Sequence, residues 1–230
     1  MKIEMLFPEV CNLFGDISNI KYLEKCIQNA EIIKTDINSE PAFAKEDVNM
    51  IYMGPMPEDI QEMAIEKLKP YKVRIEELIE KNVVFLVTGN AVEIFGKYIE
   101  NEDGSKIEGL GIFDIFAKRN MLQRHNSIFL GDYEDIEIVG FKSQFTMCYG
   151  ENKDNYFIDA KIGIGLNEKN TLEGIKKNNF IGTYILGPIL ILNPLFTKKL
   201  LKILGEKEEL AFEEEVMDAY NQRLEEFKKN

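Results

Sequence analysis

The sequence predicts an α/β fold, with a mostly parallel sheet flanked by helices and a second half that is rich in strands. Apolar strands alternate with helical patterns over the first 96 residues, as in parallel sheets with crossover helices. Residues 83–87 are five consecutive apolar residues, three of them valine, which is typical of a strand buried on both faces. After Tyr98, shorter strands alternate with glycine-containing turns. We expect residues 1–230 to form a single domain.

In the first half, strands are expected at residues 3–7, 31–36, 48–53 and 83–87. A helix capped by Ser18 is expected to run to Ala30, because apolar residues recur at helical spacing. A longer helical region follows the turn at 54–59 and ends near Lys81. Pro70 should break or kink it, because proline removes a helical hydrogen bond.

The second half is expected to begin with a hairpin-like turn at 101–106 and a strand punctuated by glycine at 108–114. Further strands are expected at 128–130, 136–141 and 156–160, followed by a glycine-rich edge at 162–167. An apolar segment at 180–192 is interrupted by Gly187 and Pro188. The pattern then becomes helical from Pro194, and residues 206–229 are expected to form a charged, solvated helix.

Composition excludes several classes of partner. The formal charge of −12 and the pI near 4.8 argue against nucleic acid or an anionic membrane, which both require basic patches. No apolar run approaches the roughly 18 residues of a membrane span, and the N-terminus lacks a secretory pattern. Three cysteines without a C-x-x-C pair indicate reduced thiols in a cytoplasm, and neither a metal site nor a cofactor is expected.

The stretch from residue 82 to residue 96 is the candidate centre of the site. A buried strand, the small turn Thr88-Gly89-Asn90 and a helical pattern over residues 91–95 follow one another. This is the geometry of a nucleophile elbow, in which a strained turn lifts one side chain above the carboxyl end of a sheet. An ordinary strand–helix unit gives the same pattern. The tip of this elbow carries Gly89, which has no nucleophile.

The order of motifs along the chain resembles a known family. The motifs are Asn12-Leu13-Phe14-Gly15-Asp16, Gly54 followed by Glu58-Asp59, the elbow, Gly96-Lys97-Tyr98, Asp103-Gly104, the segment 108–114, Val139-Gly140-Phe141, Gly163-Ile164-Gly165, Asn170, Glu173-Gly174 and the segment 181–190. Together they resemble the class I glutamine amidotransferases of the cobyric acid synthase (CobB/CobQ) type, whose fold is flavodoxin-like. Within that group the closest likeness is to amidotransferase subunits that serve Mur-ligase-like synthetases.

The resemblance implies a thiol mechanism, in which an elbow cysteine attacks the glutamine amide and a histidine moves protons. The family's elbow reads Cys-Gly-Gly, an aromatic, Gln, two apolar residues and Gly. Alignment of its last glycine on Gly96 places Gly89 at the cysteine and Glu93 at the glutamine. The family's Gly-Thr-Tyr-x-His-Gly-Pro corresponds to residues 182–188, where Leu186 replaces the histidine. Both catalytic positions are therefore expected to be degenerate, with no catalytic residue.

Three residues are candidates to replace the missing nucleophile or base. A shift of one residue places Thr88 at the tip, but no base is evident for its hydroxyl. The single histidine, His125, lies far in sequence from Leu186 and is more typical of a surface residue. Cys148 follows Lys142-Ser143-Gln144, where the family carries Glu-Asn-His, and would also lack a base.

Gly54, Gly89, Asn90 and Glu93 remain as candidate ligand-binding residues around the former catalytic position. Asn90 and Glu93 offer an amide and a carboxylate to a small, glutamine-like ligand. The favoured alternative is structural: Asn90 caps the helix start and Glu93 faces solvent.

Two functions follow from different classes. The favoured one is a non-catalytic partner, scaffold or ligand-sensing subunit of a Mur-ligase-like synthetase. The other is an active glutamine amidotransferase, which supplies ammonia for amidation of a peptidoglycan or cobalamin-type precursor. A stand-alone binding protein is a third, weaker reading.

Overall fold

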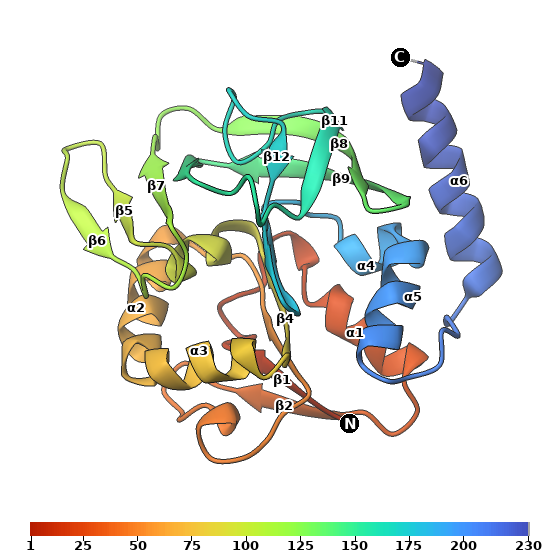
Figure 1. Ribbon diagram of the computed structural model, residues 1–230, viewed down its shortest axis with the longest axis horizontal. Coiled ribbons are helices and arrows are strands. Elements are labelled where there is room, and N and C mark those ends of the chain that lie inside the picture. The colour runs from red at the N-terminus through yellow and green to blue at the C-terminus, as the bar shows by residue number, and fades with distance from the viewer. Residues whose placement is uncertain (230) are drawn as a thin grey trace.

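The computed structural model describes residues 1–229 and contains a six-stranded central sheet with the order β13-β14-β4-β3-β1-β2 (Figure 1). All neighbouring strands are parallel except the β13–β14 pair. The order β2-β1-β3-β4-β14 is the flavodoxin-like order, and it confirms the predicted fold class. The strands are β1 (Lys2–Leu6), β2 (Glu31–Thr35), β3 (Met50–Met53), β4 (Val84–Thr88), β13 (Ile175–Lys177) and β14 (Phe180–Thr183).

Alternate residues of β4 face two separate apolar cores, because successive side chains of a strand point to opposite faces. Phe85 and Val87 pack in the core that contains α2 and α3, whereas Val84 and Leu86 pack with α1, α4 and α5. Figure 1 shows these two groups of helices on opposite sides of the central strands. The helices are α1 (Ser18–Cys26), α2 (Glu58–Leu68), α3 (Lys72–Glu80), α4 (Ile189–Leu192) and α5 (Pro194–Ile203).

Four short 3-10 helices connect these elements. Pro70 lies in one of them, between α2 and α3, and interrupts the helical region as the sequence predicts. Another follows β4 directly, so the predicted helix after the elbow is a tighter 3-10 segment. The four are η1 (Leu13–Gly15), η2 (Ala42–Ala44), η3 (Lys69–Tyr71) and η4 (Gly89–Phe95).

The strand-rich second half forms two four-stranded sheets, with orders β10-β7-β5-β6 and β12-β11-β8-β9. A bridge between Phe141 of β9 and Leu186 fastens the second of these sheets to the carboxyl end of β14. The strands are β5 (Tyr98–Glu100), β6 (Lys106–Glu108), β7 (Ile115–Arg119), β8 (His125–Tyr133), β9 (Ile136–Gln144), β10 (Thr146–Gly150), β11 (Ile158–Ile162) and β12 (Leu172–Glu173).

The last helix, α6 (Glu213–Lys229), lies at the periphery beside α4 and α5 (Figure 1). Its Tyr220 and Phe227 pack against Leu130 and Val139, and the Tyr220 hydroxyl donates to the carbonyl of Glu137 at 2.7 Å. The expected start at residue 206 was wrong by seven residues. Across residues 1–229, no helix is both long enough and apolar enough to cross a membrane.

The expected strand at 108–114 was also wrong beyond Glu108. The main-chain N–H groups of residues 110–113 instead donate to carbonyls of Ile94, Phe95 and Gly96 at the end of η4. The glycines permit this approach: a Cβ on Gly109 would lie 2.4 Å from the Gly96 carbonyl oxygen. The segment therefore supports the elbow. Strands β7 and β10 were not predicted, and β8 is much longer than the expected 128–130.

Candidate functional site

The elbow places Gly89 at the carboxyl end of β4, in a left-handed conformation that favours glycine. Its φ is +60°, in the left-handed region. A Cβ built at this position would lie 2.5 Å from the Cβ of Pro55, which belongs to a rigid ring. A cysteine therefore does not fit at this position unless Pro55 moves. The tip of the elbow has the backbone of a nucleophile turn without room for its side chain.

Leu186 lies opposite this tip because it follows β14, the parallel neighbour of β4. Thr183, the last residue of β14, is paired with Thr88. Three residues later, Leu186 exchanges two main-chain hydrogen bonds with Phe141, of 2.9 and 3.2 Å. Its side chain is buried and has no group that could transfer a proton. The fold thus brings together the two positions that the sequence singled out.

Gly89 and Leu186 line the same small cavity, of about 60 Å³, at the junction of the central sheet and the second half. Within residues 1–229, the lining of this cavity includes neither a cysteine nor a histidine. The lining residues are Leu13, Phe14, Pro55, Met56, Glu58, Gly89, Asn90, Arg124, Ser143, Gln144, Phe145, Thr146 and Leu186.

Asn90 does not cap a helix, so this structural expectation was wrong. Its side-chain oxygen accepts a hydrogen bond from the main-chain N–H of Met56 at 3.0 Å, and its Nδ2 donates to the Met56 carbonyl at 2.7 Å. The amide thereby satisfies both main-chain groups of Met56, much as a neighbouring strand would. Asn90 therefore holds the loop containing Pro55 against the elbow.

Glu93 does not face solvent, so the second structural expectation was also wrong. Its carboxylate is 1% exposed and accepts hydrogen bonds from the Thr146 and Tyr184 hydroxyls and from Gln61 Nε2. Burial raises the pKa of Glu93, and these three hydrogen bonds partly oppose that change. Gln61 in turn accepts from Arg119 Nη2 at 2.7 Å. A buried polar cluster therefore lies directly behind the elbow.

Gly54, the remaining candidate, lies behind the wall of the cavity. A Cβ at Gly54 would approach the Cys11 carbonyl oxygen to 2.6 Å and the Tyr52 hydroxyl to 2.9 Å. A glycine is therefore required at this position, where the chain after β3 packs closely against the loop that follows β1. Of the four candidate ligand-binding residues, Gly89 and Asn90 line the cavity, whereas Gly54 and Glu93 do not.

None of the three substitutes is placed to act as a nucleophile or base in this cavity. Thr88 is fully buried and its hydroxyl donates to Asp16, a carboxyl group whose pKa is raised by burial. Cys148 is fully buried in β10, and burial raises the pKa of its thiol. His125 begins β8 and contacts Ser127 Oγ at 3.0 Å, outside the lining of the cavity.

The sequence did not indicate a buried ion pair that begins at Lys142, the residue after the Leu186 partner Phe141. Lys142 Nζ lies 3.4 Å from Glu173 Oε1 and donates to the carbonyl of Gly165 at 2.6 Å, and both charged side chains are fully buried. Glu173 also accepts from the Thr183 hydroxyl and the Tyr184 N–H, each at 2.8 Å. Burial lowers the pKa of Lys142, and Glu173 opposes that change. The available signal was a lysine directly after the largely apolar run of residues 138–141.

Comparisons with known proteins identify the family of the chain. A model of the CobB/CobQ-like glutamine amidotransferase domain matches residues 2–193. The GatD subunit of lipid II isoglutaminyl synthase (glutamine-hydrolyzing) from Staphylococcus aureus is 27% identical over 90% of this chain and 85% of its own length. The GatD subunit from Streptococcus pneumoniae is 24% identical over 94% of this chain and 87% of its own length.

Solved structures support the same fold. A crystal structure of a glutamine amidotransferase matches 88% of this chain and 98% of its own, with a TM-score of 0.57 and 8% identity. A glutamine amidotransferase from Thermotoga maritima matches 88% of this chain and 82% of its own, with a TM-score of 0.50 and 11% identity. The chain therefore belongs to the family of CobB/CobQ-like glutamine amidotransferase domains.

Proposed function

We propose that this chain is a non-catalytic amidotransferase-like subunit, which docks on a Mur-ligase-like synthetase as a scaffold, regulator or ligand sensor. The observation that carries the proposal is the contact between the elbow tip and Pro55. Gly89 has no nucleophile, and its would-be Cβ position is occupied. Leu186 provides no base on the other side of the cavity. Loss of a nucleophile or base costs on the order of a million-fold in turnover.

The proposed partner is supported by the named relatives. Two proteins that align with nearly the whole chain are subunits of lipid II isoglutaminyl synthase. A chain that keeps the fold of such a subunit can keep its docking role without its chemistry. Three cysteines, none of them in a disulfide within residues 1–229, support a cytoplasmic site of action beside the synthetase.

A glutamine-like ligand is the small molecule that this subunit would sense. Gly89 and Asn90 would contact it in the cavity, while Glu93 and Gly54 hold the wall behind it. The cavity of about 60 Å³ is small for such a ligand, so Pro55 and Phe14 at its edge would have to move outward.

An active glutamine amidotransferase is the second candidate, because both named relatives are glutamine-hydrolyzing. Its nucleophile would have to be one that the alignment misses. Cys148 lies only one residue from Met147 at the larger neighbouring pocket, but its own side chain is fully buried.

Co-expression with the synthetase of the same organism tests the docking role, and a glutamine-analogue electrophile tests the chemistry. We expect a stable complex on gel filtration and an unchanged intact mass after treatment with 6-diazo-5-oxonorleucine. A labelled cysteine in the complex would support the second candidate, and failure to form any complex would contradict the docking role. A catalytically intact amidotransferase serves as the positive control for labelling.

A further inference from the structure

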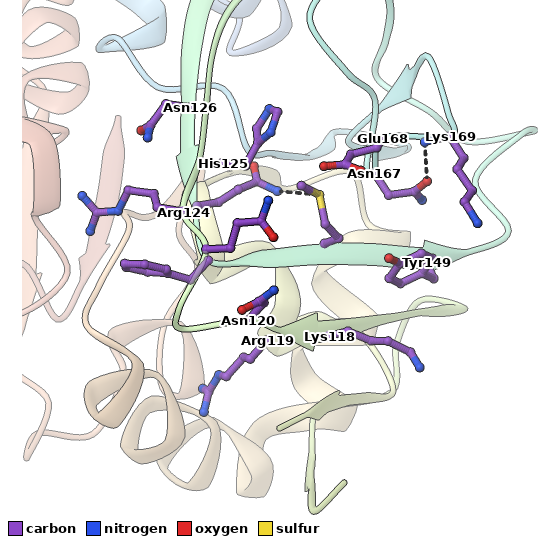
Figure 2. A pocket seen from close by; sticks show the side chains of 14 residues that line it. Lys118, Arg119, Asn120, Arg124, His125, Asn126, Tyr149, Asn167, Glu168 and Lys169 are labelled. Atoms are coloured by element: carbon purple, nitrogen blue, oxygen red, sulfur yellow. Dashed lines mark hydrogen bonds between the residues drawn. The ribbon is translucent and has the colours of Figure 1, made fainter. Parts of the chain in front are cut away.

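A second, larger pocket lies next to the small cavity and has a different chemistry. Its volume is about 420 Å³, within the range of small-molecule sites, which runs from about 300 to 1,000 Å³. It lies between β7, β10, the turn that leads into β8 and the loop 167–169 (Figure 2). Arg124, Gln144 and Phe145 line both spaces and form the wall between them.

The lining of this pocket is cationic in a chain whose net charge is −12. The lining includes four lysine or arginine residues and one acidic residue, Glu168. Such a local reversal of charge raises the local concentration of anions. The lining residues are Lys118, Arg119, Asn120, Gln123, Arg124, His125, Asn126, Gln144, Phe145, Met147, Tyr149, Asn167, Glu168 and Lys169.

Two of the four cations already have carboxylate partners. Lys118 lies 2.9 Å from Glu100, and Arg119 lies 2.9 Å from Glu62. Figure 2 shows the Arg119 side chain directed away from the middle of the pocket, consistent with its bonds to α2. These two residues therefore contribute less to ligand binding than the other two.

Arg124 and Lys169 form no ion pair with any carboxylate among residues 1–229. The Arg124 guanidinium lies over the Phe145 ring, 4.4 Å from its centroid, which restricts its position at the wall shared with the small cavity. Lys169 is presented by a tight turn, in which Asn167 Oδ1 accepts from the Lys169 N–H at 3.0 Å. In Figure 2 the two side chains lie toward opposite ends of the pocket.

Amide groups line the space between these cations, including those of Asn120, Gln123 and Gln144. Gln144 is 6% exposed, and its Nε2 donates to the Thr146 carbonyl at 2.6 Å. Its Oε1 is buried and has no hydrogen-bond partner within the described chain.

We propose that this pocket binds a small organic molecule with two anionic groups, carboxylate or phosphate, one facing Arg124 and the other facing Lys169. The amides between them bind its uncharged polar groups. The site requires neither Gly89 nor Leu186, so it goes beyond the proposed loss of catalysis and is tested separately from it.

Calorimetric titration of the full chain tests the site with two elongated molecules that carry anionic groups at both ends. Fructose 1,6-bisphosphate offers phosphates, glutamylglutamate offers carboxylates, and fructose is the uncharged control. We expect at least one of the two anionic molecules to bind and fructose not to bind. Which of the two binds more tightly identifies the anionic group that the pocket prefers.

Matched variants locate the binding. Arg124→Gln and Lys169→Gln should each lower the affinity for the anionic molecule that binds about tenfold, because each removes a charge-assisted hydrogen bond. Lys21→Gln makes the same charge change at an exposed position of α1 and should leave the affinity unchanged. The proposal would be overturned if neither anionic molecule binds, or if fructose binds equally well. It would also be overturned if Lys169→Gln and Lys21→Gln change the affinity equally.

Discussion

The position that a side chain of residue 89 would occupy lies 2.5 Å from the Cβ of Pro55. This contact couples the elbow to the loop after β3, and Asn90 reinforces the coupling through two hydrogen bonds to Met56. The loop after β3 thus occupies the place where a side chain at residue 89 would stand. Under the proposed non-catalytic role, a cysteine introduced at residue 89 alone is not expected to restore a working nucleophile.

Gly89→Ala is expected to destabilise the protein more than the same change at another left-handed glycine. Gly104 also has positive φ, but nothing lies within 4 Å of its would-be Cβ. Gly104→Ala should therefore cost only the backbone strain of about 1–2 kcal/mol. Gly89→Ala should cost a further 1–3 kcal/mol, because the new methyl group overlaps Pro55. Urea unfolding of both variants measures the difference, and equal losses would show that the Pro55 contact is unimportant.

Asn90→Ala should loosen the loop after β3 without disturbing the core. It removes both hydrogen bonds to Met56, which together are worth about 1–3 kcal/mol. The Met56 N–H should then exchange with solvent at least about fivefold faster, because it loses its acceptor. Hydrogen exchange monitored by NMR measures this rate. If the exchange rate of the Met56 N–H does not change, or if the amides of β4 exchange faster by the same factor, Asn90 does not hold this loop locally.

Lys142→Met should destabilise the protein by about 3–5 kcal/mol, because it leaves the Glu173 carboxylate buried without its cation. Glu173→Gln in the same chain removes that stranded charge and keeps a side chain of similar shape. The double variant should therefore be more stable than Lys142→Met alone. Unfolding free energies of the wild type, the two single variants and the double variant, measured by heat and urea, complete a double-mutant cycle. Additive losses would mean that the two groups do not interact.

The buried Glu93 should make stability depend on pH. Burial raises its pKa in the folded state above the ordinary value of 4.5, so the folded state favours the protonated carboxyl group. The stabilising contribution of this raised pKa to the free energy of unfolding is fully present below pH 4.5, and it is lost as the pH rises through the folded-state pKa. The stability of the wild type relative to Glu93→Gln should therefore fall as the pH increases above about 4.5. Unfolding free energies of both proteins between pH 4 and 8 test the sign, and a difference that grows with pH would contradict it.

Cys26 should react before the other two thiols. It is half-buried, whereas Cys11 and Cys148 are buried, and burial raises the pKa of Cys11 to about 12. Native protein treated briefly with iodoacetamide should carry a single label at Cys26, as located by peptide mass spectrometry. Preferential labelling of Cys148 would instead indicate that its thiol is an accessible nucleophile.

The sequence predicted the parts of this molecule that depend on short-range pattern. Residues 83–87 were recognised as a buried strand because three valines and two other apolar residues leave no polar face. The meeting of Gly89 and Leu186 followed from the family resemblance, and the parallel pairing of β4 and β14 brings it about.

Long-range contacts explain the failures. Asn90 bonds a residue 34 positions away, and Glu93 bonds Tyr184 across 91 positions, so neither environment was visible in local sequence. Local sequence rules predicted that Asn90 caps a helix and that Glu93 faces solvent, but tertiary contacts determine the environment of both residues. Lys142 was missed for the same reason, because its partner Glu173 lies 31 positions away, on β12 at the opposite edge of the same sheet.

Glutamate release from glutamine by the purified complex of this chain with its synthetase tests the central claim most directly. The comparison is the synthetase alone, measured under the same conditions. We predict that the wild-type complex releases glutamate no faster than the synthetase alone. Release that requires this chain and disappears in Cys148→Ala or Thr88→Ala would contradict the account, because it would show a working nucleophile in a chain that we describe as non-catalytic.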